Sequence, residues 1–294
     1  IIIKSIKPNF RKISINTKKY LQLNKKFNLN LSLKQYSKIF NDFSKNIKQG
    51  KTYQIKIAQT YSKKGNINSI DLFWKLMKMN ESPESFLIRE KDYNIVSCSP
   101  ETLILKKDNT IRTKPIAGTL RKTKQLNKNK ALTFFRRNEK ETKEHNMIVD
   151  MERNDLSKIC KTGSVKIDKL KKVEEYRDLF HYVTTIKGVI KNKMSNHDII
   201  SSLMPGGSVI GCPKISTIQL LNRKEKFDRN IYTGSFGIIH SNGDMRFNIM
   251  IRTLLNFKND IELSVASGVI LGSTAKKEYN ENYIKAKSLL DLFN

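Results

Sequence analysis

YTGSFGIIHSNGDMRFNIMIRTLLNFKNDIELSVASGV, residues 232–269, carries the clearest fold signal in this chain. Its apolar runs predict three strands, Tyr232–Ile239, Phe247–Leu255 and Ile261–Val269. The dipeptide Asn242-Gly243 is a strong signal for a tight hairpin between the first two strands. The segment therefore predicts antiparallel pairing.

Outside this segment, strands and long helices follow one another without a regular βαβ order. Apolar spacing predicts helices over Ser32–Lys48, Glu139–Cys160 and Lys276–Phe293. Further strands are expected at Tyr53–Gln59, Phe86–Ile88, Ile95–Ser97, Leu103–Leu105 and Phe180–Ile190. This mixture indicates an α+β domain.

The composition is that of a folded, strongly basic protein. Of the 294 residues 38% are hydrophobic, and no apolar run approaches membrane-spanning length. The net charge of +29 suggests nucleic acid, but the lysines are spread along the chain without an aromatic-interleaved basic stripe. We therefore expect neither nucleic acid nor a membrane as partner. Cys98, Cys160 and Cys212 form no metal or disulfide spacing, which fits a reducing, cytoplasmic location.

Two pairs of glutamates, one in each half of the chain, are the strongest candidates for chemistry. Members of each pair are three residues apart, so their carboxylates share one face of a helix. Four such acids can hold a divalent cation and leave positions open for an anionic substrate. Solvated helix faces are the alternative, but His145 and Ile148 continue the first face and favour an inward orientation. The four are Glu141, Glu144, Glu278 and Glu281.

Three further features have both a functional and a structural interpretation. The glycine-rich stretch Pro205–Lys214 precedes a helix and is similar to a phosphate cradle, but it lacks the Walker spacing and is equally a tight turn. Arg252, among apolar neighbours, suits a fork for a carboxylate or a structural salt bridge. His181, on an alternating strand, suits proton transfer near neutrality or simple packing.

Several short motifs follow one another along most of the chain. They are Ser99-Pro100-Glu101, Pro115–Thr119, Lys140–His145, Met147–Asp150, Arg153–Leu156, His181, Pro205–Lys214, Tyr232-Thr233-Gly234, Ile251-Arg252-Thr253 and Glu278–Lys285. Together they resemble the chorismate-utilising enzymes: anthranilate synthase, aminodeoxychorismate synthase, and the isochorismate and salicylate synthases. The resemblance spans roughly residues 35–290. It implies an anthranilate-synthase-like chorismate-binding fold, with two large, mainly antiparallel sheets packed together and helices on the outer faces.

The resemblance also implies roles for the glutamates. Glu144 and Glu281 are expected to bind Mg²⁺ directly, and Glu141 and Glu278 through water. The metal is expected to hold the ring carboxylate of chorismate, because a cation must stand between four carboxylates and a dianionic substrate.

The same resemblance implies a catalytic set and a substrate-binding set. Glu101 is expected to protonate the departing C4 hydroxyl and His181 to assist proton transfers, with Thr119 as their neighbour at the site. The substrate contacts that the resemblance implies are Ser208, Tyr232, Arg252, Gly268 and Lys285.

Two positions distinguish the branches that the resemblance covers. Where the water-using enzymes carry a lysine general base, this chain has Gln54, which cannot take a proton from water. Where typical aminodeoxychorismate synthases carry a lysine nucleophile, it has Ala117, which forms no covalent intermediate. The expected function is therefore an anthranilate synthase catalytic subunit, a lyase acting on chorismate in the first step of tryptophan biosynthesis. Aminodeoxychorismate synthase is the alternative, as is a degenerate, non-catalytic member suggested by Ala266 and Gly272, which replace the usual residues.

The resemblance implies a partner and a longer upstream region. Family large subunits usually take ammonia from a glutamine amidotransferase subunit, so such a subunit is expected here. They also carry a long upstream half that builds a tryptophan pocket. In this chain only the Lys- and Asn-rich residues 1–30 precede the catalytic domain at 31–294. We interpret residues 1–30 as an arm or remnant and expect weak or no sensitivity to tryptophan.

Overall fold

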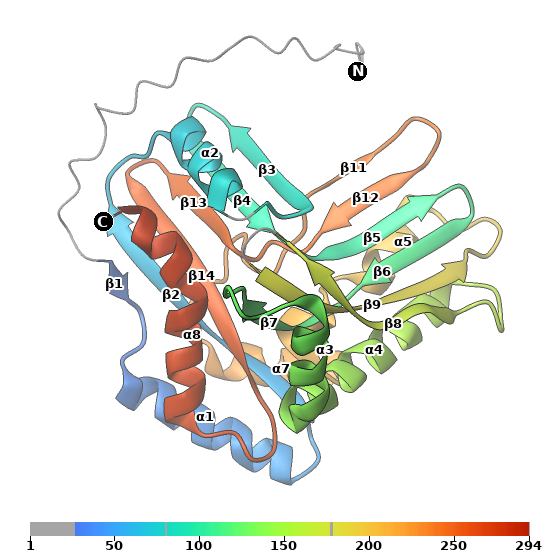
Figure 1. Ribbon diagram of the computed structural model, residues 1–294, viewed down its shortest axis with the longest axis horizontal. Coiled ribbons are helices and arrows are strands. Elements are labelled where there is room, and N and C mark those ends of the chain that lie inside the picture. Colours follow the sequence, from blue (N-terminus) through green and yellow to red (C-terminus); the bar gives the residue numbers. More distant parts are fainter. Residues whose placement is uncertain (1–26, 80, 177–178, 294) are drawn as a thin grey trace.

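The computed structural model describes residues 27–79, 81–176 and 179–293, so most of the predicted arm lies outside the described residues. Two antiparallel, seven-stranded sheets form its centre (Figure 1). The first has the order β1 (Asn28–Leu29), β2 (Gln54–Lys64), β14 (Asp260–Val269), β13 (Thr253–Phe257), β4 (Tyr93–Ser99), β3 (Glu84–Arg89), with β10 (Gly211–Cys212) also on β2. The second has the order β11 (Gly237–Ile239), β12 (Met245–Asn248), β5 (Thr102–Lys107), β6 (Thr110–Lys114), β9 (Leu179–Val189), β7 (Ile116–Arg121), with β8 (Lys166–Glu175) also on β9. The expected α+β fold with two antiparallel sheets is confirmed.

Helices pack on both sheets, and their starts follow local sequence signals. α1 (Leu33–Lys48) begins at a capping box on Ser32, and α4 (Glu139–Ile159) begins at Asn138, whose side chain accepts from the Glu141 N–H. α1 and α8 (Ala275–Leu290) lie against the first sheet, and α4 lies against the second (Figure 1). No helix among the described residues is long and apolar enough to cross a bilayer. The other helices are α2 (Ser69–Met79), α3 (Lys128–Arg137), α5 (Asn196–Leu203), α6 (Gly207–Ile210), α7 (Lys214–Lys224) and the 3₁₀ turn Asp291–Phe293.

The prediction of one strand over Phe247–Leu255 is wrong, because the chain changes sheets inside this range. β12 ends in the second sheet at Asn248, and β13 begins in the first sheet at Thr253. Between them Arg252 adopts a φ of 49°, a left-handed conformation that interrupts the strand. The sequence hides this break, since the residues on both sides of it are apolar or buried.

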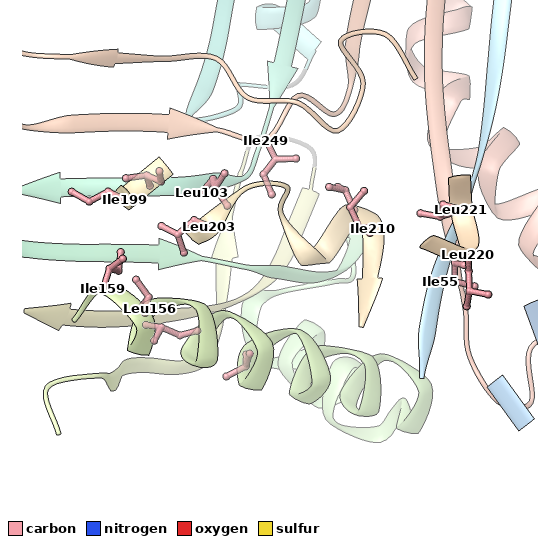
Figure 2. Close-up of a cluster of buried hydrophobic side chains, with 14 of the residues drawn as sticks. Ile55, Leu103, Leu156, Ile159, Ile199, Leu203, Ile210, Leu220, Leu221 and Ile249 are labelled. Atoms are coloured by element: carbon pink, nitrogen blue, oxygen red, sulfur yellow. The ribbon is translucent and has the colours of Figure 1, made fainter. Parts of the chain in front are cut away.

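One apolar cluster joins the two sheets through the helices between them. Figure 2 shows Ile55 of β2, Leu103 of β5, Leu156 of α4, Ile210 of α6 and Leu220 of α7 within this cluster. Burial of one such aliphatic side chain contributes about 1.5–3 kcal/mol. The cluster therefore fixes α4, α6 and the first sheet relative to one another, which positions the side chains described next.

Candidate active site

The two places where the chain passes between the sheets lie side by side. One joins β4 to β5 through Glu101, and the other joins β12 to β13 through Arg252. Backbone hydrogen bonds tie them together, from the Ile249 N–H to Glu101 O (3.0 Å) and from the Cys98 N–H to Arg252 O (3.1 Å). The Ser99 hydroxyl adds a 2.6 Å bond to Ile249 O. The fold itself therefore brings together the predicted acid and the predicted carboxylate fork.

Three polar side chains meet above Gly268 in β14. Gln54 Nε2 and Lys56 Nζ, from alternate positions of β2, both donate to Glu144 Oε1, at 2.6 and 2.5 Å. A Cβ at residue 268 would lie 2.8 Å from each of these three atoms. Glycine suits this position, because a side chain would occupy the space in which the three groups meet. Two predicted site residues, Gly268 and Glu144, are thus brought together.

The second glutamate pair lies in a network of lysines between α4 and α8. Lys140 Nζ is 2.7 Å from Oε1 of the buried Glu278 and 3.6 Å from Glu281 Oε2. Lys285 Nζ is 2.7 Å from Glu281 Oε1 and 3.0 Å from Ala266 O. Burial opposes ionisation of Glu281, but Lys285 and Lys140 together lower its pKa to about 2. Glu281 is therefore a fixed negative charge at neutral pH.

Glu141 extends the acidic face of α4 toward the second sheet. A Cβ on Gly118 in β7 would lie 3.0 Å from Glu141 Oε2, so this carboxylate rests on the strand. Burial raises the pKa of Glu141, and the charges of Glu144 and Glu281 raise it further. The carboxylates of α4 and α8 therefore influence one another's ionisation. His145, on the same face of α4, is fully buried, which confirms that this face points inward as predicted.

The glutamates suit a divalent cation chemically, although lysines contact them here. Across the described ranges, no group of three or more His, Cys, Asp and Glu side chains is gathered closely enough to hold a metal ion. Lys56 and Lys140 supply positive charge to Glu144 and Glu278 instead. Glu278 Oε2 is a buried acceptor with no hydrogen-bond partner among the described residues. Carboxylate oxygens are ligands that Mg²⁺ prefers, so these side chains suit the ion by their chemistry, while lysines balance their charge in this structure.

Glu101 has the properties of a general acid. It is 3% exposed, and burial raises its pKa to about 7. Hydrogen bonds from the Ser208 side chain and the Ile116 N–H, and the charges of Lys56 and Arg252, limit that rise. A carboxyl with a pKa near neutrality carries a proton that it can give to a leaving group.

His181 faces the same site as a neutral imidazole. Burial, and then the charge of Arg252, lower the pKa of His181 to about 3. The Tyr176 ring packs edge-on against it, with 5.3 Å between ring centroids. At this pKa the imidazole does not titrate near neutrality, contrary to the expectation from the sequence, but a neutral imidazole both donates and accepts hydrogen bonds. Thr119 is the register partner of His181 on β7, and only its backbone belongs to the described structure.

Two of the predicted substrate contacts lie inside the protein. Ser208 and Tyr232 are both buried, and burial raises the pKa of Tyr232 to about 12. The Ser208 side chain lies close enough to Glu101 to lower its pKa by hydrogen bonding, whereas Gln54 Oε1 is a buried acceptor with no hydrogen-bond partner in the described part of the chain. Since buried polar atoms are nearly always satisfied, Gln54 Oε1 is an acceptor that a donor group of a bound ligand would satisfy.

The glycine-rich stretch before α7 serves close packing. A Cβ on Gly207 would lie 1.5 Å from Met151 Cε, and one on Gly206 would lie 2.6 Å from Ile249 Cδ1. These contacts seat α6 against α4 and against the chain crossing that carries Arg252. The glycines therefore position Ser208.

Two buried residues near the site were not among the predicted site residues. Lys56 is 7% exposed and contacts Glu144; its signal was its alternate position to Gln54, which places both on one face of a strand. Glu152, on α4, is 3% exposed and accepts a 2.5 Å hydrogen bond from the Thr113 hydroxyl. Its signal was helical spacing, because Glu152 lies seven residues after His145 and four after Ile148, on the inward face of the helix.

Replacing Glu152 with Gln is expected to make the free energy of unfolding less dependent on pH. Burial, reinforced by the charge of Glu101, raises the pKa of Glu152 from 4.5 to about 8, so the folded state retains the proton. The stability from this proton is complete below about pH 4.5 and is lost as pH rises through about 8. Glu152→Gln cannot ionise, so at about pH 8.5 it should exceed the wild type by an amount on the order of a few kcal/mol.

Urea unfolding at about pH 5 and about pH 8.5 measures this difference. Glu139→Gln is the matched control, because Glu139 lies on the same helix with its side chain 84% exposed. Equal pH dependence in the two variants would show that Glu152 is not held protonated.

Known proteins are similar in sequence to this chain over most of its length. The family described as chorismate binding enzyme matches residues 8–291. The anthranilate synthase component I-like protein of Synechocystis is 35% identical over 259 residues, covering 87% of this chain and 53% of that protein. Aminodeoxychorismate synthase component 1 of Bacillus subtilis is 34% identical over 241 residues, covering 82% of this chain and 51% of that protein. The chain thus spans about half the length of these relatives.

Solved structures share its architecture. Anthranilate synthase component I from Streptococcus pneumoniae matches with a TM-score of 0.82 and 29% identity, over 92% of this chain and 60% of that one. The menaquinone-specific isochorismate synthase from Escherichia coli has the same fold, with a TM-score of 0.83 at 21% identity, over 96% of this chain and 66% of that one. The family match covers nearly the whole sequence, and the chain belongs to the chorismate binding enzyme family.

Proposed function

We propose that the chain is the catalytic part of a Mg²⁺-dependent anthranilate synthase, which converts chorismate and ammonia to anthranilate and pyruvate. The observation that carries this proposal is Gln54, whose amide lies 2.6 Å from Glu144 within the site. An amide cannot take a proton from water, so Gln54 favours ammonia, which is itself a nucleophile, over water. Lys56 is the nearby amine, but although burial opposes its charge, Glu144 raises its pKa and holds it protonated.

The buried groups divide the work on the substrate. Arg252 and Tyr232 bind the carboxylate of the enolpyruvyl group, and Ser208 and the Gly268 backbone lie along the ring. Glu101 gives its proton to the departing C4 hydroxyl while ammonia adds at C2. His181, neutral at neutral pH, moves the proton whose loss accompanies release of pyruvate and formation of the aromatic ring.

Residues of α4 and α8 hold the cation in this proposal. Glu144 and Glu281 are its direct ligands, and Glu141 and Glu278 hold it through water. When bound, Mg²⁺ neutralises the ring carboxylate of chorismate and so allows a dianion to enter an acidic site.

Ammonia is proposed to come from a separate glutamine amidotransferase subunit. Cys98 and Cys160 are each 1% exposed and packed in separate apolar clusters of the core. Neither therefore offers an accessible thiol for glutamine hydrolysis. The partner is inferred from the relatives named as component I, which implies a second component.

The position of the new amino group separates this proposal from its alternative. Aminodeoxychorismate synthase is the second candidate, because the Bacillus subtilis protein of that name is 34% identical. The chain has Ala117 where the resemblance places a lysine nucleophile, which disfavours that route. Incubation with chorismate, Mg²⁺ and ¹⁵N-ammonium, followed by NMR of the product, should place nitrogen on C2 of an aromatic ring. Nitrogen on C4 would replace the proposal with the alternative.

A further inference from the structure

Lys56 is a buried ammonium at the centre of the carboxylate site. Its Nζ lies 2.5 Å from Glu144 Oε1 and 2.8 Å from where a Cβ of residue 268 would stand. Gln54, on the same face of β2, donates to the same glutamate oxygen. Lys56 and the Gln54 amide therefore donate to the same oxygen of Glu144. The Lys56 ammonium also faces the Gly268 backbone, which is proposed to line the substrate.

The charge of Lys56 reaches the other groups of the site. It limits the rise that burial causes in the pKa of Glu101 and in that of Tyr232. Glu281, on the opposite helix, in turn stabilises the Lys56 ammonium. The Lys56 ammonium therefore interacts electrostatically with Glu101, with Tyr232 and with the glutamates of α4 and α8.

We propose that Lys56 is the resident counter-cation of this site: it holds Glu144 until a divalent cation replaces it, and then binds a carboxylate of the anionic substrate. This inference rests on the proposed function and deepens it. An ammonium and a divalent cation repel each other at contact distance, so both cannot share Glu144 Oε1. A displaced, buried ammonium needs a new anionic partner, and the incoming carboxylate supplies one.

The inference predicts coupling between metal and substrate. The metal releases Lys56 for the substrate, and the substrate in turn stabilises the released ammonium. By linkage, each ligand should then strengthen the binding of the other. Removing the ammonium should have opposite effects on the two ligands: tighter binding of metal alone, and weaker binding of substrate when metal is present.

Mn²⁺ titration of the metal site tests the first effect. Free Mn²⁺ counted by electron paramagnetic resonance should show Lys56→Met binding on the order of tenfold more tightly than the wild type. Lys63→Met is the matched control, because Lys63 lies on the same strand, is 4% exposed and has its ammonium over the Phe27 ring. Lys63→Met should bind Mn²⁺ as the wild type does, and Lys56→Arg, which keeps the charge, should stay near the wild-type value.

Chorismate binding tests the second effect. Calorimetric titration with chorismate at saturating Mn²⁺ and without ammonia should show Lys56→Met binding about tenfold more weakly. Circular dichroism verifies the fold of each variant with Mn²⁺ present, because Lys56→Met leaves Glu144 without its cation when metal is absent. Its melting temperature should therefore rise more on adding Mn²⁺ than that of Lys63→Met.

The outcomes separate the inference from the proposed function. A wild type that forms anthranilate, while Lys56→Met and Lys63→Met bind both ligands alike, overturns the role of Lys56 and leaves the function standing. Failure of every variant and of the wild type to bind Mn²⁺ removes the proposed metal, and with it the inference. Opposite shifts in Mn²⁺ and chorismate affinity, confined to Lys56→Met, establish the inference.

Discussion

Replacing Glu101 with Gln is expected to lower kcat for anthranilate formation by roughly 10²–10⁴-fold, the usual contribution of general acid catalysis. Gln has nearly the same shape, so it keeps the packing of the chain crossing but has no proton to give. In the wild type the rate should fall as pH rises above about 7, because burial places the pKa of Glu101 there. Glu101→Gln should lose this limb of the pH profile.

The control for this variant is Glu152→Gln, which neutralises another buried carboxyl outside the proposed machinery. Stopped assays of anthranilate between about pH 6 and pH 9 should show Glu152→Gln retaining the wild-type kcat and its high-pH limb. A Glu101→Gln variant with wild-type kcat would remove Glu101 from the role of acid.

Replacing Arg252 with Met is expected to lower kcat/KM for chorismate by about 10²–10³-fold, since truncating one partner of a buried charge pair costs about 2–5 kcal/mol. Arg252 adopts a left-handed φ of 49° where the chain changes sheets, and its charge interacts with that of Glu101. Arg252→Lys keeps the charge and loses the planar fork, so it should fall between the wild type and Arg252→Met.

Arg246→Met is the matched control, because Arg246 lies on the adjoining strand β12 and pairs with Glu84, with 2.9 Å from Nε to Oε2. It should lose stability while keeping the wild-type KM for chorismate. Initial rates over a range of chorismate concentrations measure all three variants. An unchanged KM and kcat in Arg252→Met would assign Arg252 a purely structural role.

Local signals in the sequence were sufficient for the helices. Apolar spacing placed the starts of α1 and α4 within a residue, and the structure adds the caps at Ser32 and Asn138 that fix them. These signals work because they act between residues close in sequence. The inward face of α4 followed from His145 in the same way.

The features that the sequence did not reveal depend on contacts between distant residues. The break at Arg252 lies in an apolar run, and only the pairing of β12 with β5 and of β13 with β4 shows it. Strand alternation places Lys56 on the same face as Gln54, but only the structure brings Glu144 against it. The glycines before α7 suggested an anion site, whereas Gly207 is needed for contact with Met151.

The stoichiometry of the reaction tests the central claim most directly. The purified chain is incubated with chorismate, Mg²⁺ and excess ammonium, and anthranilate is followed by fluorescence while pyruvate is assayed enzymatically. We expect anthranilate and pyruvate in equal amounts. EDTA should abolish the formation of both, and Mg²⁺ should restore it. Chorismate left unchanged, or consumed to an amino product without release of pyruvate, would contradict it.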